Sequence, residues 1–379
     1  MSSNEILLGR AGGVATITIN RPQALNALTL ANYRHFAPAL KAWAADPAVY
    51  AVLVRGAGGR AFCAGGDVRA VYEAGRGVGG DPDLTAVFFR EEYRLIRDIH
   101  RFPKPYIALI DGITMGGGAG ISVNGAYRLA TPRTLLAMPE TAIGLFPDVG
   151  ATRFLNRCPG QIGRYLGLGG ARLRAADALY CGFATHVLAE GAVEPLVEAL
   201  GRTEWRAGAE RQQLDAALSS LGMEREPAPL AALRPAIDRC FAGDTIEAIL
   251  AALAAEAAGG GAVAGWAAQT RAGLLAKSPT SLKVTLRQLQ IGADYDLDQA
   301  LILEYRLTQH MMAGHDFYEG VRAALIDKDQ QPRWRPATLA EIDEAMIDAY
   351  FAPLGDGELN FAPAVEMCPP NRDVTICAI

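Results

Sequence analysis

The sequence predicts an α/β protein whose C-terminal part is helical. Short apolar runs at 13–19, 51–55 and 105–110 are rich in β-branched residues, which indicates strands. Between these runs, residues 30–43 and 88–99 carry apolar side chains at every third or fourth position, which is typical of helices that pack on a sheet. The first half of the chain therefore reads as repeated ββα or βα units.

Further elements follow in the same order. Strands are expected at 127–130 and 135–138, and a helix from Gly150. After about Gly201 the β-branched runs end, and Ala, Leu, Glu and Arg recur at helical spacing. The helices expected in this half span 206–221, 229–241, 245–258, 278–289 and 297–312, the fourth of them with Ser278 as its N-cap and Pro279 at its first position.

These patterns divide the chain into three parts. Residues 1–205 are expected to form an α/β core that holds the active site, and residues 206–340 a helical region. Residues 341–379 are expected to contain a helix remnant and an irregular tail. From Pro353 onward, Pro, Gly and polar residues prevail, which is typical of irregular or disordered segments.

Composition argues against several classes of protein. Of the 379 residues 50% are apolar, and 36 Lys and Arg against 41 Asp and Glu give a net charge of −5. This balance lacks the basic field of a nucleic-acid-binding protein. The longest apolar run, 248–255, is far shorter than the about 20 residues that cross a bilayer, and Glu5 and Arg10 interrupt any signal-peptide core. We expect a cytoplasmic protein with no nucleic-acid or membrane partner.

Cysteine and histidine patterns argue against a metal site and a Ser-His-Asp site. The six cysteines lie far apart, without a CxxC pair and without histidine at zinc-ligand spacing, so reduced thiols and no metal site are expected. The five histidines have no serine partner in a GxSxG elbow. Cys63 is expected to pack as a small apolar residue.

Two glycine-rich loops share one design. Residues 61–67 (AFCAGGD) and 115–120 (MGGGAG) each follow a strand and precede a helix. Glycine lets a backbone approach a ligand closely, and a helix N-terminus favours negative charge. Two amides from two such loops would form an oxyanion hole for a thioester carbonyl. Taken singly, each loop is better explained by helix capping or close packing, and neither has the spacing of a nucleotide-binding loop.

Several motifs surround these loops in a specific order. They are NRP at 20–22, LNAL at 25–28 and MPETAIGLFPDVG at 138–150. Together with the loops they resemble the enoyl-CoA hydratase/isomerase (crotonase) superfamily. Further motifs are FFREEY at 88–93, GITM at 112–115, SPTSLK at 278–283, GHDF at 314–317 and EGVR at 319–322. These are similar to the 3-hydroxyisobutyryl-CoA hydrolases, the thioesterases of valine breakdown, and the match runs from about 6 to 337.

The resemblance implies a crotonase-like spiral of ββα units with a C-terminal helical region. It also implies an acyl-CoA bound in an extended groove, with CoA as part of the substrate and no separate cofactor. The amides of Ala64 and Gly117 would form the oxyanion hole. Relatives often assemble through their helical halves, which leaves a homo-oligomer open.

The carboxylates bear on the reaction. Hydration of an enoyl thioester needs two acid/base groups, and relatives that hydrate have a Glu at the position of Gly120. The resemblance brings Glu140 and Asp148 to the oxyanion loops. Glu140 is the expected catalytic group, as a general base or as a nucleophile that forms an acyl anhydride, and Asp148 would orient the substrate hydroxyl or water or assist proton transfer. Without the resemblance, Glu140 reads as a first-turn helix residue and Asp148 as an N-cap.

The second Glu of FFREEY, Glu92, contacts substrate in the hydrolases that the chain resembles. Its alternative is a solvated or ion-paired residue beside Arg90 and Arg94. Three basic residues could reach the phosphates of CoA, but such residues are more often surface ion-pair partners, so no CoA contact is assigned to them: Arg21, Lys283 and Arg287.

Three functions stay open at this stage. The first is hydrolysis of 3-hydroxyisobutyryl-CoA to 3-hydroxyisobutyrate and CoA. The second is an enoyl-CoA isomerase or hydratase with the same fold. The third is a non-catalytic acyl-CoA-binding protein, against which an intact Glu140 argues.

Overall fold

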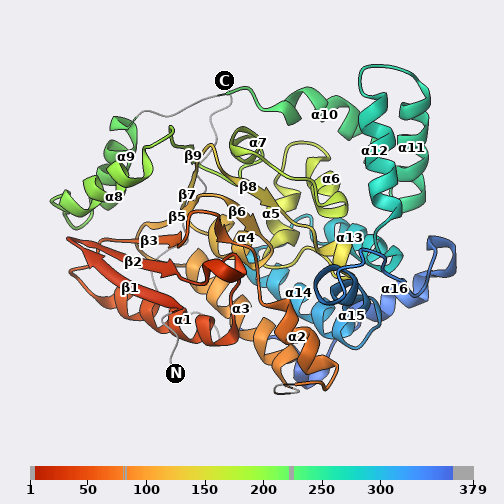
Figure 1. The fold of residues 1–379 in the computed structure, drawn as a ribbon, viewed down its shortest axis with the longest axis horizontal. Helices are drawn as coiled ribbons and strands as arrows, with labels where there is room; N and C mark the ends of the chain where they lie inside the picture. The colour runs from red at the N-terminus through yellow and green to blue at the C-terminus, as the bar shows by residue number, and fades with distance from the viewer. Residues whose placement is uncertain (1–4, 80, 82, 222–225, 362–379) are drawn as a thin grey trace.

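The structure is a computed structural model that describes residues 5–79, 81, 83–221 and 226–361. Its larger sheet has the order β1-β2-β3-β5-β7-β9, and a smaller sheet has the order β4-β6-β8 (Figure 1). Only the β1–β2 pair among these strands is antiparallel. The strands are β1 Ile6–Ala11, β2 Val14–Ile19, β3 Ala51–Gly56, β4 Ala61–Cys63, β5 Tyr106–Ile110, β6 Ile113–Met115, β7 Tyr127–Ala130, β8 Leu135–Ala137 and β9 His186–Val187. The predicted α/β class is confirmed.

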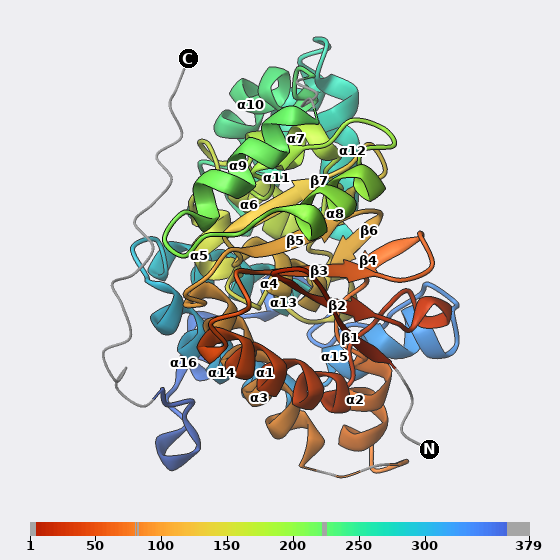
Figure 2. The same ribbon diagram turned by 90° about the vertical axis from the view of Figure 1, so that its left-hand side faces the viewer.

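The central strands β3 and β5 of the larger sheet are buried on both faces, and successive side chains of each strand point to opposite faces. In β3, Ala51 and Leu53 pack with leucines of α8 (Val193–Arg202) and α9 (Glu210–Ser220). Val52 and Val54 face the main core. That core includes side chains of α1 (Leu30–Ala45) and α3 (Leu84–His100), which lie below the strands in Figure 2.

The second half is helical, as predicted. The helices after Gly201 in the described residues are α9 Glu210–Ser220, α10 Pro229–Cys240, α11 Ile246–Ala258, α12 Ala264–Leu275, α13 Pro279–Ile291, α14 Leu297–Met312, α15 Asp316–Val321 and α16 Glu344–Phe351. Ser278 caps α13 as expected, since its hydroxyl accepts a hydrogen bond from the amide of Ser281 at 3.0 Å. Helices α11 and α12 form a hairpin that stands far from β1 in Figure 1.

Some elements were not predicted. Instead of one helix from Gly150, three short helices follow, α5 Ala151–Asn156, α6 Ile162–Gly169 and α7 Ala175–Tyr180. Each is too short to show a clear helical period. β1 was also missed, because this edge strand is mostly exposed and lacks an alternating pattern. Residues 353–361 contain one turn of 3-10 helix, Gly355–Gly357, and the rest of the predicted irregular tail lies outside the described residues.

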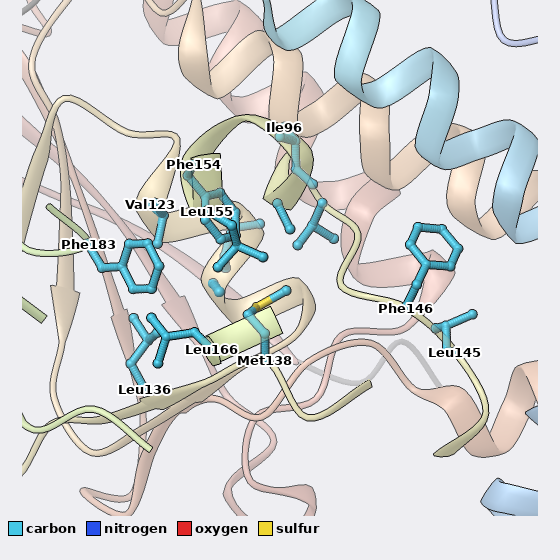
Figure 3. Packing of buried hydrophobic residues seen from close by; sticks show 14 of the residues in the cluster. Ile96, Val123, Leu136, Met138, Leu145, Phe146, Phe154, Leu155, Leu166 and Phe183 are labelled. Atoms are coloured by element: carbon cyan, nitrogen blue, oxygen red, sulfur yellow. The ribbon is translucent and has the colours of Figure 1, made fainter. Parts of the chain in front are cut away.

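One apolar core joins the sheets to the helical region. The main cluster contains residues from Ala15 in β2 to Leu359 near the end of the described chain. Figure 3 shows part of it, with labelled side chains from α3, α4 (Gly117–Val123), α5, α6 and β8. The cluster also includes Met138, just before Glu140, and Leu145 and Phe146, which lie between Glu140 and Asp148 (Figure 3). None of the helices in the described part of the chain is long and apolar enough to cross a membrane.

Candidate active site

The two glycine-rich loops lie side by side because the strands before them are neighbours. β4 and β6 pair in parallel, so the turns at their carboxyl ends emerge at the same edge of the smaller sheet. The first turn leads into α2 (Val68–Gly75), whose N-cap is Asp67. The second passes through Gly116 into α4, and the φ of +49° and ψ of −123° at Gly116 suit only glycine.

The structure corrects one predicted oxyanion donor. The amide of Ala64 donates to the carbonyl of Leu25 at 3.0 Å and so is not available to a substrate. Within the described part of the chain, the amides of Gly66 and Gly117 have no hydrogen-bond acceptor. A β-carbon placed on Gly117 would lie 3.2 Å from Gly66 N, so the two residues are adjacent. Gly66 and Gly117 are therefore the pair suited to an oxyanion hole.

Glu140 lies beside these loops. It begins the 3-10 helix η2 (Glu140–Ile143), which follows β8 of the smaller sheet. Its side chain is buried, and a β-carbon on Gly116 would lie 3.2 Å from Glu140 Oε1. Its other oxygen, Oε2, is buried and has no hydrogen-bond partner among the described residues. A buried carboxylate oxygen without a partner is costly for stability, which marks Glu140 as a functional candidate.

Asp148 reaches the same region from the loop before α5. The hydroxyl of Tyr93 on α3 donates to Asp148 Oδ2 at 2.7 Å, and Asp148 is buried. The alternative of an N-cap is wrong, because Asp148 makes no capping hydrogen bond to α5. Instead, the carboxylate of Glu304 on α14 accepts hydrogen bonds from the amides of Gly150 at 2.7 Å and Thr152 at 2.8 Å.

Glu92 is buried next to the second loop. The hydroxyl of Tyr33 on α1 donates to Glu92 Oε1 at 2.5 Å, and a β-carbon on Gly117 would lie 2.5 Å from the same oxygen. The solvated or ion-paired alternative is therefore wrong for Glu92. Arg90, one of the proposed ion-pair partners, donates instead to the hydroxyl of Tyr305 at 2.7 Å.

Burial raises the pKa of all three predicted acids, Glu140, Glu92 and Asp148. It raises the pKa of Glu140 and of Glu92 well above the ordinary value of 4.5, and the negative charge of Asp148 adds to both shifts. Burial also raises the pKa of Asp148 to about 6, although the hydrogen bond from Tyr93 opposes that shift. A carboxyl pKa of about 6, as for Asp148, suits proton transfer near neutral pH.

Gly120 has no room for the acid that hydrating relatives carry there. A β-carbon at Gly120 would lie 2.7 Å from Cβ of Val149 and 2.9 Å from Cδ1 of Ile96. Gly120 lies inside α4 and does not adopt a positive φ, so packing and not backbone strain excludes a larger residue. The site therefore has Glu140, Asp148 and Glu92 but no carboxylate from α4.

Sequence reasoning missed four residues of this region: Tyr33, Gly66, Tyr93 and Glu304. The sequence did carry a signal for the two tyrosines. Both lie on the apolar faces of amphipathic helices, and a buried tyrosine hydroxyl needs a hydrogen-bond partner, which indicates a polar group nearby. For Gly66, the sequence gives no indication of which amide in the turn is already bonded.

The structure also places the cysteines and the basic residues that the sequence analysis singled out. Cys63 is buried in the core, and the four cysteines in the described part of the chain are free. The basic residues set aside as ion-pair partners do form ion pairs. These are Arg21 with Asp67 at 3.1 Å, Lys283 with Glu247 at 3.2 Å and Arg287 with Asp348 at 3.0 Å.

Comparison with known proteins identifies the family. A family model described as enoyl-CoA hydratase/isomerase matches residues 14–351. The chain belongs to this family. Among its relatives are proteins named 3-hydroxyisobutyryl-CoA hydrolase, mitochondrial. The one from Danio rerio is 46% identical over 94% of this chain and 92% of its own, and the human one is 42% identical over 95% and 92%. The predicted superfamily and its hydrolase branch are confirmed.

Solved structures of the enoyl-CoA hydratase/isomerase family share the fold. A protein described as a carnitinyl-CoA dehydratase from Mycobacterium thermoresistibile matches with a TM-score of 0.85 and 41% identity, over 96% of this chain and 100% of that one. An enoyl-CoA hydratase from Rhodobacter sphaeroides 2.4.1 matches with a TM-score of 0.82 and 39% identity, over 94% and 100%. The predicted crotonase-like fold is confirmed.

The expected cytoplasmic location is wrong. The hydrolase relatives from Danio rerio, Xenopus laevis and human are all named mitochondrial. The expectation rested on charge and on the lack of an apolar N-terminal core, and neither property reports the compartment of an α/β enzyme.

Proposed function

We propose that this chain hydrolyses 3-hydroxyisobutyryl-CoA to 3-hydroxyisobutyrate and free CoA, a step of valine breakdown. The observation that carries the proposal is the buried carboxylate of Glu140 beside the amides of Gly66 and Gly117. In the part of the chain that the structure describes, one oxygen of Glu140 and both of these amides have no hydrogen-bond partner. The names of relatives that match over more than nine-tenths of the chain support the same substrate and reaction.

The two amides act on the thioester oxygen. As the carbonyl carbon is attacked, its oxygen becomes negative, and the N–H groups of Gly66 and Gly117 stabilise that charge. A donor of this kind lowers the barrier by about 3 kcal/mol in a measured case. The buried surroundings strengthen the interaction because few other dipoles screen it.

Glu140 drives the cleavage by one of two routes with the same products. As a general base, it takes a proton from water, the hydroxide attacks the carbonyl carbon, and the proton passes to the departing CoA thiolate. As a nucleophile, it displaces the thiolate to form an anhydride, which water then hydrolyses. Both routes need the ionised form of Glu140, and the raised pKa makes that form both a stronger base and a stronger nucleophile, so either route fits the site.

Asp148 and Glu92 hold the rest of the acyl group. Each accepts a hydrogen bond from a tyrosine hydroxyl and retains further acceptor capacity for the 3-hydroxyl of the substrate or for water. The substrate carries its own CoA, and the proposed reaction uses no separate cofactor.

Hydration of an enoyl-CoA is the second candidate, because the two solved relatives named above are described as a dehydratase and a hydratase. The packing of Val149 and Ile96 against Gly120 argues against it, since no acid can stand at the position where hydrating relatives carry one. Glu140 and Asp148 would have to perform both proton transfers.

A thiol-release assay separates the candidates. The protein is incubated with 3-hydroxyisobutyryl-CoA, 3-hydroxypropionyl-CoA or crotonyl-CoA, and free CoA is measured with a chromogenic thiol reagent. We expect CoA release from the two hydroxyacyl thioesters. Loss of the crotonyl double bond without thiol release would instead identify a hydratase, and tight binding without turnover a non-catalytic binder.

A further inference from the structure

The loop that carries Asp148 has an unusual backbone. Val149, the next residue, has a φ of +60°, in the left-handed region that β-branched side chains avoid. Gly150 follows with a φ of +91°. Such a conformation persists only where the surrounding structure holds it in place.

Side chains from three helices hold this loop. Gln288 Nε2 of α13 donates to the carbonyl of Pro147 at 2.8 Å, and Asn124 Nδ2 at the end of α4 donates to the carbonyl of Val149 at 3.0 Å. Both side chains are buried. The third holder is Glu304 of α14, and it makes the largest number of these contacts.

Glu304 is fully buried and accepts three hydrogen bonds from the start of α5. The donors are the amide of Gly150 at 2.7 Å, the amide of Thr152 at 2.8 Å and the hydroxyl of Thr152 at 2.7 Å. Gln288 Nε2 also donates to the Thr152 oxygen at 2.8 Å, which leaves the hydroxyl proton for Glu304. Both oxygens of Glu304 are therefore needed as acceptors.

Glu304 itself has no direct hydrogen bond to Asp148, so it acts through the backbone. It fixes Gly150 and Thr152 on the far side of the strained Val149, while Gln288 fixes Pro147 on the near side. Between these two contacts, the Asp148 side chain accepts a hydrogen bond from the Tyr93 hydroxyl at 2.7 Å.

We propose that Glu304 is a positioning residue that holds the strained loop 147–150 so that Asp148 points into the active site. This inference rests on the proposed thioester hydrolysis. It assigns the helical region a part in the reaction, since α14 begins 149 residues after Asp148.

Glu304→Gln tests the proposal. Glutamine keeps the length of the side chain but has one acceptor oxygen, and its NH₂ group faces an N–H donor. The matched control is Thr308→Val, which lies one turn further along α14, is equally buried, and donates only to the carbonyl of Tyr305 in its own helix. Steady-state CoA release and hydrogen exchange of peptides that cover 145–156 are measured for both variants.

For Glu304→Gln we expect kcat to fall by about 10- to 100-fold while KM changes by less than about threefold, since the loop orients the reaction and not the CoA moiety. Exchange at the amides of Gly150 and Thr152 should become at least about tenfold faster. Thr308→Val should match the wild type in both measurements. Loss of folded protein would also lower the apparent kcat at unchanged KM, so the exchange measurement separates the two cases: positioning requires faster exchange confined to the 145–156 peptides, with the remaining peptides as in the wild type.

Two results would overturn the inference: unchanged kcat in Glu304→Gln, or unchanged exchange in the 145–156 peptides. A wild type that releases no CoA would refute the proposed function. In that case the exchange measurement still decides whether Glu304 holds the loop.

Discussion

At the level of single residues, hydrogen-bond partners distinguish three buried acids of the same site. Asp148 and Glu92 each accept a hydrogen bond from a tyrosine hydroxyl, whereas Glu140 Oε2 has no partner among the described residues. A carboxylate tied to a donor is a weaker base and is held in one orientation. Glu140 is therefore the acid free to react, and the other two are suited to binding and orientation.

Glu140→Gln should abolish most turnover. Glutamine preserves shape but neither accepts a proton from water nor forms an anhydride, so kcat should fall by at least about 100-fold with KM within about threefold. CoA release at saturating substrate measures this. Glu190→Gln, an exposed residue in the loop before α8, is the control and should keep full activity. A Glu140→Gln protein as active as the control would rule out both proposed routes.

Tyr93→Phe should raise the pKa of Asp148 above its value of about 6, because the lost hydrogen bond favoured the charged form. If ionised Asp148 is required, the acidic limb of the kcat/KM profile should move up by about one pH unit. Tyr106→Phe is the control, since that hydroxyl donates to the carbonyl of Ile121 and to no acid. An acidic limb that stays in place in Tyr93→Phe would show that Asp148 ionisation does not control the rate.

At the level of elements, the glycines of α4 let the neighbouring segments of the active site pack closely against its backbone. Its residues Gly117, Gly118 and Gly120 allow β4, α3 and the Asp148 loop to approach its backbone. A β-carbon on Gly118 would lie 2.1 Å from the carbonyl oxygen of Cys63. Helix α3 contributes Glu92 and Tyr93 as neighbours in sequence, so one helix places an acid at the glycine loop and a hydroxyl at Asp148.

Gly120→Ala should destabilise the protein by about 1 to 3 kcal/mol, because the new methyl group would overlap Val149 and Ile96. The matched control is Gly273→Ala in the interior of α12, where a β-carbon meets no atom within 4 Å. That change should stabilise the protein by about 0.5 to 1 kcal/mol through helix propensity. Urea denaturation measures both. Equal effects at the two positions would contradict the packing argument and reopen position 120 to an acid.

At the level of the whole molecule, four buried carboxyl groups and one continuous core link folding to function. Glu304 joins Glu92, Glu140 and Asp148 in the interior, and burial raises its pKa to about 8 against the hydrogen bonds from Gly150 and Thr152. The helical region therefore contacts the site through the hydrogen bonds of Glu304 as well as through apolar packing. Loss of its contacts should disturb the site before the sheet unfolds.

The sequence alone determined the strands β2, β3, β5, β7 and β8, most helices of the second half, the two glycine-rich loops, the missing acid at Gly120 and the family. These features are local: they depend on residue type, short-range periodicity and motif spacing. Glu140 and Asp148 were also identified in this way, although only the resemblance indicated that they share a pocket.

The tertiary structure alone decided which groups are free to act. Leu25 occupies the amide of Ala64, so the donor is Gly66, and Tyr93 and Tyr33 occupy Asp148 and Glu92 while Glu140 Oε2 stays unpartnered among the described residues. Glu304 bonds to Gly150 across 154 positions of sequence. Local propensity carries no information on such contacts, because burial and hydrogen-bond satisfaction depend on which distant segments the fold brings together.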